Sequence, residues 1–229
     1  MLSLRETAQC IGISGNFSLL RDFFGYQTVN FSSKDESLRT QLQLMQGKHI
    51  NLDILLVGLE SLNSANTMDV IDSAISETRR IYEQVRIGVG RVEYYPISRQ
   101  EAEGHDVITL FAEATTLASK FRGEHDDAID LFIVREYLRQ VAGKIYAGQC
   151  WIIRCSKRQG CVMGMRTIDG PIGDLGGLMA HELGHALNLR HRYADRYRNN
   201  LMFINRSGTE LTEEQGRTMR HDCFARNGC

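Results

Sequence analysis

The spacing of apolar residues predicts alternating strands and helices in the middle of the chain. Residues 51–60 form a short apolar run with β-branched members, which is typical of a buried strand. Residues 69–85 repeat their apolar positions at helical spacing, and residues 85–97 alternate as a second strand. Residues 107–122 indicate another helix, and residues 128–134 a third strand. This order predicts an α/β fold in which helices pack on a twisted sheet.

Polar residues mark where several helices begin. Thr67 is placed to cap the first predicted helix. A turn-rich loop with Asp169 and Asp174 leads into an apolar segment, and Asp174 is the expected N-cap of the helix there. Thr212 can cap a C-terminal helix that ends near residue 224. Between these helices, residues 150–154 and 160–166 read as two strands of a hairpin.

Composition and charge add no further element to this predicted fold, but they argue against some classes of protein. A chain of 229 residues with 42% apolar residues suits one domain with a packed core. The formal net charge of −1, from 27 basic and 28 acidic residues, does not favour nucleic acid as a partner. No apolar run approaches the roughly 18 residues that a membrane span needs. Residues 1–10 lack the apolar segment of a signal peptide, which leaves a cytoplasmic protein or a processed form.

Six cysteines lie mainly in two groups. They are Cys10, Cys150, Cys155, Cys161, Cys223 and Cys229. In an exported protein this even set predicts disulfides, whereas in a cytosolic one it predicts free thiols or a second metal site. Their spacings do not match the paired cysteines of ordinary structural zinc sites, and the sequence does not determine the connectivity.

The strongest chemical signal is the H-E-x-x-H motif formed by His181, Glu182 and His185. Residues four apart lie on one face of a helix, so both imidazoles can reach one cation. Glu182 is rotated about 100° from His181, beside the metal without being a ligand. The apolar residues of this segment fall on the opposite arc of the helix. The pattern predicts a zinc site on a half-buried helix.

A catalytic zinc site takes three protein ligands and a water, so a third ligand is needed. His191 lies six residues after His185, and a continuing helix would place it on the far side. The chain must therefore turn sharply, and Asn188 can adopt the left-handed backbone that often ends a helix. We expect the helix to stop near Asn188 and His191 to return to the metal.

A rival third ligand is a glutamate farther along the chain. Glu210, Glu213 and Glu214 are available for that role. Their position next to Thr212 is instead typical of the first turn of a helix, where acidic residues interact favourably with the helix dipole. His191 is the favoured ligand.

The segment H-E-x-x-H-x-x-N-x-x-H resembles the signature of the metzincin zinc proteases, with Asn188 in place of the usual glycine. Met202 stands where the family has a methionine-containing turn beneath the zinc. The resemblance implies a metzincin-like zincin fold: a twisted mixed sheet with helices, a catalytic helix and a small C-terminal subdomain. It implies a catalytic domain at residues 49–229, with an upper part at 49–188 and a lower part at 189–229. Residues 1–48 are then an N-terminal extension or pro-like segment.

The resemblance also implies an activity. One catalytic Zn²⁺ held by His181, His185 and His191 lowers the pKa of its bound water, and Glu182 acts as general base in peptide hydrolysis. A protein or peptide substrate adds as an extended strand to the sheet edge, which the family places within residues 161–166.

Several alternatives stay open in the sequence. A non-proteolytic binding or regulatory module could use the same zinc-containing fold. A second, cysteine-bound zinc, or a calcium ion near Asp169 and Asp174, is not established. A secreted location is favoured over a cytoplasmic one. Substrate preference and oligomeric state are not predicted.

Overall fold

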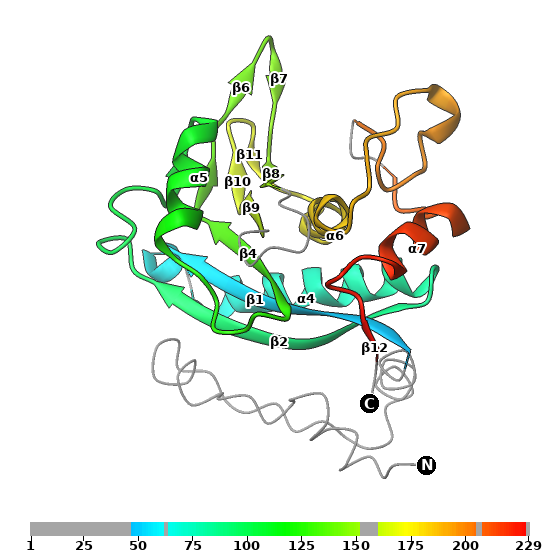
Figure 1. The fold of residues 1–229 in the computed structure, drawn as a ribbon. Coiled ribbons are helices and arrows are strands. Elements are labelled where there is room, and N and C mark those ends of the chain that lie inside the picture. Colours follow the sequence, from blue (N-terminus) through cyan, green and yellow to red (C-terminus); the bar gives the residue numbers. More distant parts are fainter. Residues whose placement is uncertain (1–46, 62–63, 152–159, 205–207, 228–229) are drawn as a thin grey trace.

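A computed structural model describes residues 47–61, 64–151, 160–204 and 208–227. The predictions for residues 1–46 lie outside these ranges. In the described part, a mixed sheet packs against α-helices on both of its faces (Figure 1). The main helices are α4 (Ser64–Glu83), α5 (Phe111–Lys120), α6 (Leu175–Ala186) and α7 (Glu213–Arg220). The predicted α/β class is confirmed.

Five strands form the body of the sheet, in the order β2-β1-β4-β9-β8. Their bounds are β1 (Lys48–Val57), β2 (Ile87–Ile97), β4 (Ala128–Val134), β8 (Gly148–Trp151) and β9 (Gly160–Gly164). The first four in this order are parallel, and β8 runs antiparallel to β9. The two-residue strand β12 (Arg226–Asn227) pairs with Lys48 and His49, on the side of β1 that β4 occupies from Asn51 onward.

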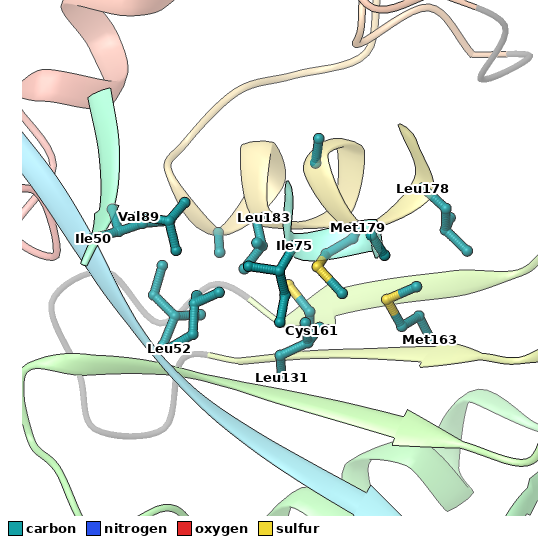
Figure 2. Close-up of a cluster of buried hydrophobic side chains, with 14 of the residues drawn as sticks. Ile50, Leu52, Ile75, Val89, Leu131, Cys161, Met163, Leu178, Met179 and Leu183 are labelled. Carbon is teal, nitrogen blue, oxygen red and sulfur yellow. The ribbon is translucent and has the colours of Figure 1, made fainter. Parts of the chain in front are cut away.

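Successive side chains along each strand point to opposite faces of the sheet, so the core consists of two clusters, one on each face. Leu52 and Ile54 point to the face covered by α4 and α6, whereas Leu55 and Val57 point to the face covered by α5. Figure 2 shows Leu183 and other side chains of α6 directed at those of the strands. The central strands are buried on both faces, which is why they read as continuous apolar runs.

Short elements connect this framework. They are η1 (Leu59–Ser61), β3 (Val107–Ile108), β5 (Glu136–Tyr137), β6 (Gln140–Val141), β7 (Lys144–Ile145), β10 (Arg166–Thr167), β11 (Gly170–Pro171) and η2 (Asp195–Tyr197). The hairpins β6–β7 and β10–β11 lie beyond the end of the sheet near α5 (Figure 1).

Two predicted helix starts are wrong. Helix α4 begins at Ser64, so Thr67 lies inside it rather than at its cap. The predicted helix at residues 107–122 is a strand followed by a helix, because Val107 and Ile108 pair with β5 before α5 begins at Phe111. The second error arises because the pairing of β3 with β5, a tertiary contact, shortens the helix beyond its local pattern.

The predicted substrate edge is also wrong. Strand β9, which covers most of residues 161–166, is paired with β4 on one side and with β8 on the other. In the described sheet the edge strand beside α6 is β8, residues Gly148–Trp151. Residues 160–164 are fully buried, as expected for an internal strand.

Cys150 and Cys161 are directly opposite each other on β8 and β9 and form a disulfide. Cys223 is also disulfide-bonded, while Cys10, Cys155 and Cys229 lie outside the described residues. Disulfides are typical of proteins from oxidising compartments. The oxidised pair also removes two of the thiolates that a cysteine-bound second zinc would need.

In the ranges that the structure describes, every helix is too short or too polar to cross a membrane.

Candidate metal centre

The helix that carries the H-E-x-x-H motif is anchored at its start and along its buried side. Asp174 is the N-cap, and its Oδ1 accepts a hydrogen bond from Gly177 N at 2.7 Å, as predicted. From α4, the Tyr82 hydroxyl donates to the Ala180 carbonyl at 2.9 Å. Burial raises the pKa of Tyr82 well above its ordinary value, so the hydroxyl keeps the proton it donates. These bonds hold α6 against the rest of the core.

The C-terminal end of α6 is set by Asn188. Its φ of 68° lies in the left-handed region, which confirms the predicted turn. Asn188 N donates to His185 O and Leu189 N donates to Gly184 O, both at 2.9 Å. This pair of bonds is the Schellman arrangement, in which a left-handed residue reverses the chain and satisfies the last carbonyls of the helix. The turn directs His191 back toward the helix.

The three histidines of the motif converge at one point. His181 Nε2 lies 3.2 Å from His191 Nε2, and His185 Nε2 lies 3.0 Å from the same atom. His181 is buried, while His185 and His191 are partly buried. Ligands about 2.0–2.1 Å from a tetrahedral zinc ion lie about 3.3 Å from one another. The observed separations are close to that value.

Backbone carbonyls determine which ring nitrogen faces the centre. His181 Nδ1 lies 2.7 Å from Leu201 O, and His185 Nδ1 lies 2.9 Å from Leu189 O. A carbonyl oxygen only accepts, so each Nδ1 is the donor and each Nε2 is the nitrogen that faces the centre and can bind a metal. Lone pairs directed at one point repel each other unless a cation lies between them. The cluster therefore fits an H-E-x-x-H type zinc site.

Met202 packs against α6 at Gly184, between His181 and His185 in the sequence. It is fully buried, and a Cβ added to Gly184 would lie 2.8 Å from Met202 Sδ. The segment around Met202 runs beside the chain that follows His191, because Arg192 N donates to Met202 O at 2.7 Å. The methionine packs under the histidine-bearing helix, and its neighbour Leu201 supplies the carbonyl that orients His181.

Two buried amides that sequence reasoning missed hold this segment in place. Asn200 Nδ2 donates to Gln215 Oε1 at 2.8 Å, and Gln215 Nε2 donates to Asn200 Oδ1 at 2.9 Å. Asn200 Oδ1 also accepts from Met202 N at 3.1 Å. Gln215 belongs to the capping box of α7, with Thr212 as the predicted cap. That capping pattern was the available signal, but it did not reveal the contact with Asn200.

Glu182 lies between the helix and the edge strand and is 4% exposed. Its carboxylate Oε2 lies 3.4 Å from Cys150 Sγ. A Cβ added to Gly148 would lie 3.0 Å from both Cγ and Cδ of Glu182. The side chain therefore extends along β8, which pairs with β9 alone among the described strands.

The rival glutamates are engaged elsewhere. Glu213 and Glu214 lie in the first turn of α7, where Glu213 pairs with Arg220 at 2.5 Å and Glu214 approaches Arg192 at 3.6 Å. Glu210 pairs through its backbone with Asn199 and Leu201. The three histidines form the group of potential metal ligands in the described part of the chain, and no calcium cluster occurs there around Asp169 and Asp174.

An open cavity of about 370 Å³ lies beside His191. It is lined by residues 188–192 and by Glu214, Gln215 and Thr218 of α7. A second cavity, of about 480 Å³, continues along α7 past Arg217 and His221. The segment after His191 and α7 thus bound a hollow next to the histidine cluster.

Comparisons with known proteins do not assign a family. No protein-family model matches the chain, and none of the curated proteins does. Among solved structures, one similar chain comes from a chaperone–substrate complex, with 16% sequence identity and a TM-score of 0.44. The match covers 75% of this chain and 34% of the other. A likeness of this degree does not establish a shared fold.

Proposed function

We propose that this chain is a zinc-dependent endopeptidase of the metzincin type. The observation that supports it most is the convergence of three Nε2 atoms, with two of the rings oriented by carbonyls, at the helix that also carries Glu182. His181, His185 and His191 are the proposed zinc ligands, and Glu182 is the proposed general base. The left-handed Asn188 takes the place of the glycine in the family signature.

The residues divide the work of peptide hydrolysis between them. A zinc ion, when bound, supplies a Lewis acid that acidifies water and polarises a carbonyl. Glu182 accepts the proton of the attacking water on its carboxylate and delivers it to the leaving amine. The carbonyls of Leu201 and Leu189 keep His181 and His185 in the tautomer that binds metal. Met202 forms an apolar floor that keeps water from below the ligands.

The substrate is proposed to be a protein or peptide in extended conformation. Strand β8 pairs with β9 along one edge, and in the described sheet its other edge has no strand partner. An added strand would receive backbone hydrogen bonds there, and Glu182 would lie beside it. The cavity next to His191 is a proposed pocket for a side chain near the cut bond. Residues 49–229 are the proposed catalytic domain, with residues 1–48 as an extension, and secretion is the proposed location.

The decisive experiment is hydrolysis of a fluorogenic peptide library and of casein by zinc-loaded protein. A chelator should abolish cleavage, and added zinc should restore it. Glu182→Gln should retain zinc and lower the rate by about 10²–10⁴-fold, the usual contribution of a general base. Glu210→Gln is the matched control, because the Glu210 side chain is exposed and lines neither of the two cavities, so the rate should not change.

Two results would contradict the proposal. A Glu182→Gln variant that cleaves at the wild-type rate would place the base elsewhere. Zinc-loaded protein that cleaves nothing, both as the full chain and after removal of residues 1–48, would favour a binding module with the same metal centre. Metal analysis of His181→Ala, His185→Ala and His191→Ala accompanies both measurements and tests the ligand set.

A further inference from the structure

The disulfide between Cys150 and Cys161 lies directly against the proposed general base. Cys150 Sγ is 2.9 Å from the Glu182 carbonyl oxygen and 3.4 Å from its carboxylate Oε2. Cys161 Sγ is 3.2 Å from the same carbonyl oxygen. Because both sulfurs are oxidised, they carry no proton, so these are packing contacts rather than hydrogen bonds.

Gly148 completes the surface on which Glu182 lies. It is two residues before Cys150 on β8, so the two positions face the same side of the strand. A Cβ at Gly148 would lie 3.0 Å from Glu182 Cγ and Cδ, and 2.9 Å from Val162 O. The glutamate side chain therefore passes over a position without a side chain and ends beside the disulfide.

This arrangement restricts the conformation of the Glu182 side chain. A glutamate has three rotatable bonds, and fixing such a side chain costs conformational entropy. Strand β8 is short, with four residues, and pairs with β9 alone among the described strands. The covalent bond joins β8 to the internal strand β9 at a directly paired position. The surface against which Glu182 rests is thereby tied covalently to the internal strand β9.

We propose that the Cys150–Cys161 disulfide is a positioning element that holds the Glu182 carboxylate for catalysis. This inference rests on the proposed peptidase function. Displacement of a catalytic group by about 1 Å can lower a rate by about 10²-fold. Breaking the disulfide should therefore lower kcat by a larger factor than it raises KM, and zinc content should stay the same, because the histidines are not touched.

The test compares three forms of the full chain. The first is the oxidised wild type, the second is the wild type reduced by a phosphine that is then removed, and the third is the Cys150→Ala/Cys161→Ala variant. Each is assayed for kcat, KM, zinc content and thermal unfolding. The alanine variant treated with the same phosphine is the control, because it retains the disulfide of Cys223 and reports any effect of breaking that bond.

The proposal predicts that kcat falls at least 10-fold in both the reduced and the alanine forms, with a smaller change in KM and full zinc content. Reoxidation should restore the wild type and not the variant. A lower melting temperature with unchanged kcat would overturn it, because the disulfide would then be only structural. An active alanine variant beside an inactive reduced wild type would also overturn it, since new thiols rather than the lost crosslink would be responsible.

A second measurement does not depend on proteolysis. Crystal structures of the oxidised and alanine forms should show one conformation of the Glu182 side chain in the first and a displaced or multiple conformation in the second. The same single conformation in both would refute the positioning role. If zinc-loaded oxidised protein cleaves no peptide, the proposed function fails, while this comparison still decides whether the disulfide positions Glu182.

Discussion

Asp130 offers a quantitative test of the electrostatics inside the sheet. It lies on β4 directly beside Asp53 of β1, which is fully buried. Burial is the main cause that raises the pKa of Asp130 to about 6 from the ordinary 3.8, and the charge of Asp53 adds to it. The hydrogen bond that Gly123 N donates to Asp130 Oδ1, at 3.1 Å, lowers this pKa but does not cancel the effect of burial.

The sign of the effect on stability follows from the raised pKa. The folded chain binds this proton more tightly than the unfolded chain does, so the contribution of Asp130 is most favourable at low pH. It is lost as the pH rises from 3.8 through about 6. The difference between these values corresponds to about 3 kcal/mol at full ionisation, an upper limit because the side chain is partly exposed to solvent.

Asp130→Asn should remove this penalty while its Oδ1 still accepts from Gly123 N. The free energy of unfolding of the variant should exceed that of the wild type by about 1–3 kcal/mol above pH 7, and by much less near pH 4. Urea unfolding at several pH values measures both quantities. A difference that does not change with pH, or a variant that is less stable at pH 7.5, would refute the reasoning.

Asp127→Asn is the matched control with the opposite sign. Burial tends to raise the pKa of Asp127, but its hydrogen bond and ion pair with Arg91, at 2.5 Å, outweigh burial and lower the pKa. A lowered carboxylate pKa contributes stability above its ordinary pKa, and that stability is lost as the pH falls. Asp127→Asn should therefore destabilise the protein at neutral pH and have less effect in acid.

Three further predictions concern the metal centre. Asn188→Gly should preserve or raise thermal stability, because glycine adopts the φ of 68° without a Cβ cost. Asn188→Val should weaken zinc binding, measured in a competition titration. Equal zinc affinity of the two variants would contradict the argument that a left-handed residue 188 returns His191 to the metal. Gly184→Ala should lower the free energy of unfolding by about 1–3 kcal/mol, because the added Cβ would lie 2.8 Å from Met202 Sδ. Adding Met202→Ala to this variant should recover part of that loss. Urea unfolding measures both free energies. Gln215→Leu should remove both hydrogen bonds between Gln215 and the buried amide of Asn200, which costs about 1–3 kcal/mol of stability. Zinc affinity should fall about 10-fold or more. A variant with unchanged stability and unchanged zinc affinity would show that this pair does not support the metal centre.

Local sequence patterns predicted much of the geometry of the candidate site. The i, i+4 spacing of His181 and His185 determines a shared helix face wherever a helix forms, and the left-handed tendency of Asn188 predicts the turn before His191. The capping residues Asp174 and Thr212 were predictable for the same reason, because their bonds join backbone groups only three residues away. The roles of the histidines and Glu182 in catalysis remain proposals.

The sequence by itself determined the elements that depend on near neighbours: buried strands from apolar runs, helices from a 3.6-residue period, and the starts of α6 and α7 from their capping residues. Only the tertiary structure decided which strand lies at the edge of the sheet, because β8 and β9 have similar local patterns and differ in what pairs beside them. The same holds for the Cys150–Cys161 bond and the Asn200–Gln215 pair, whose members meet only after distant segments pack. Such contacts are set by strand order and helix packing, since a local period records burial but not the identity of the residue on the other side.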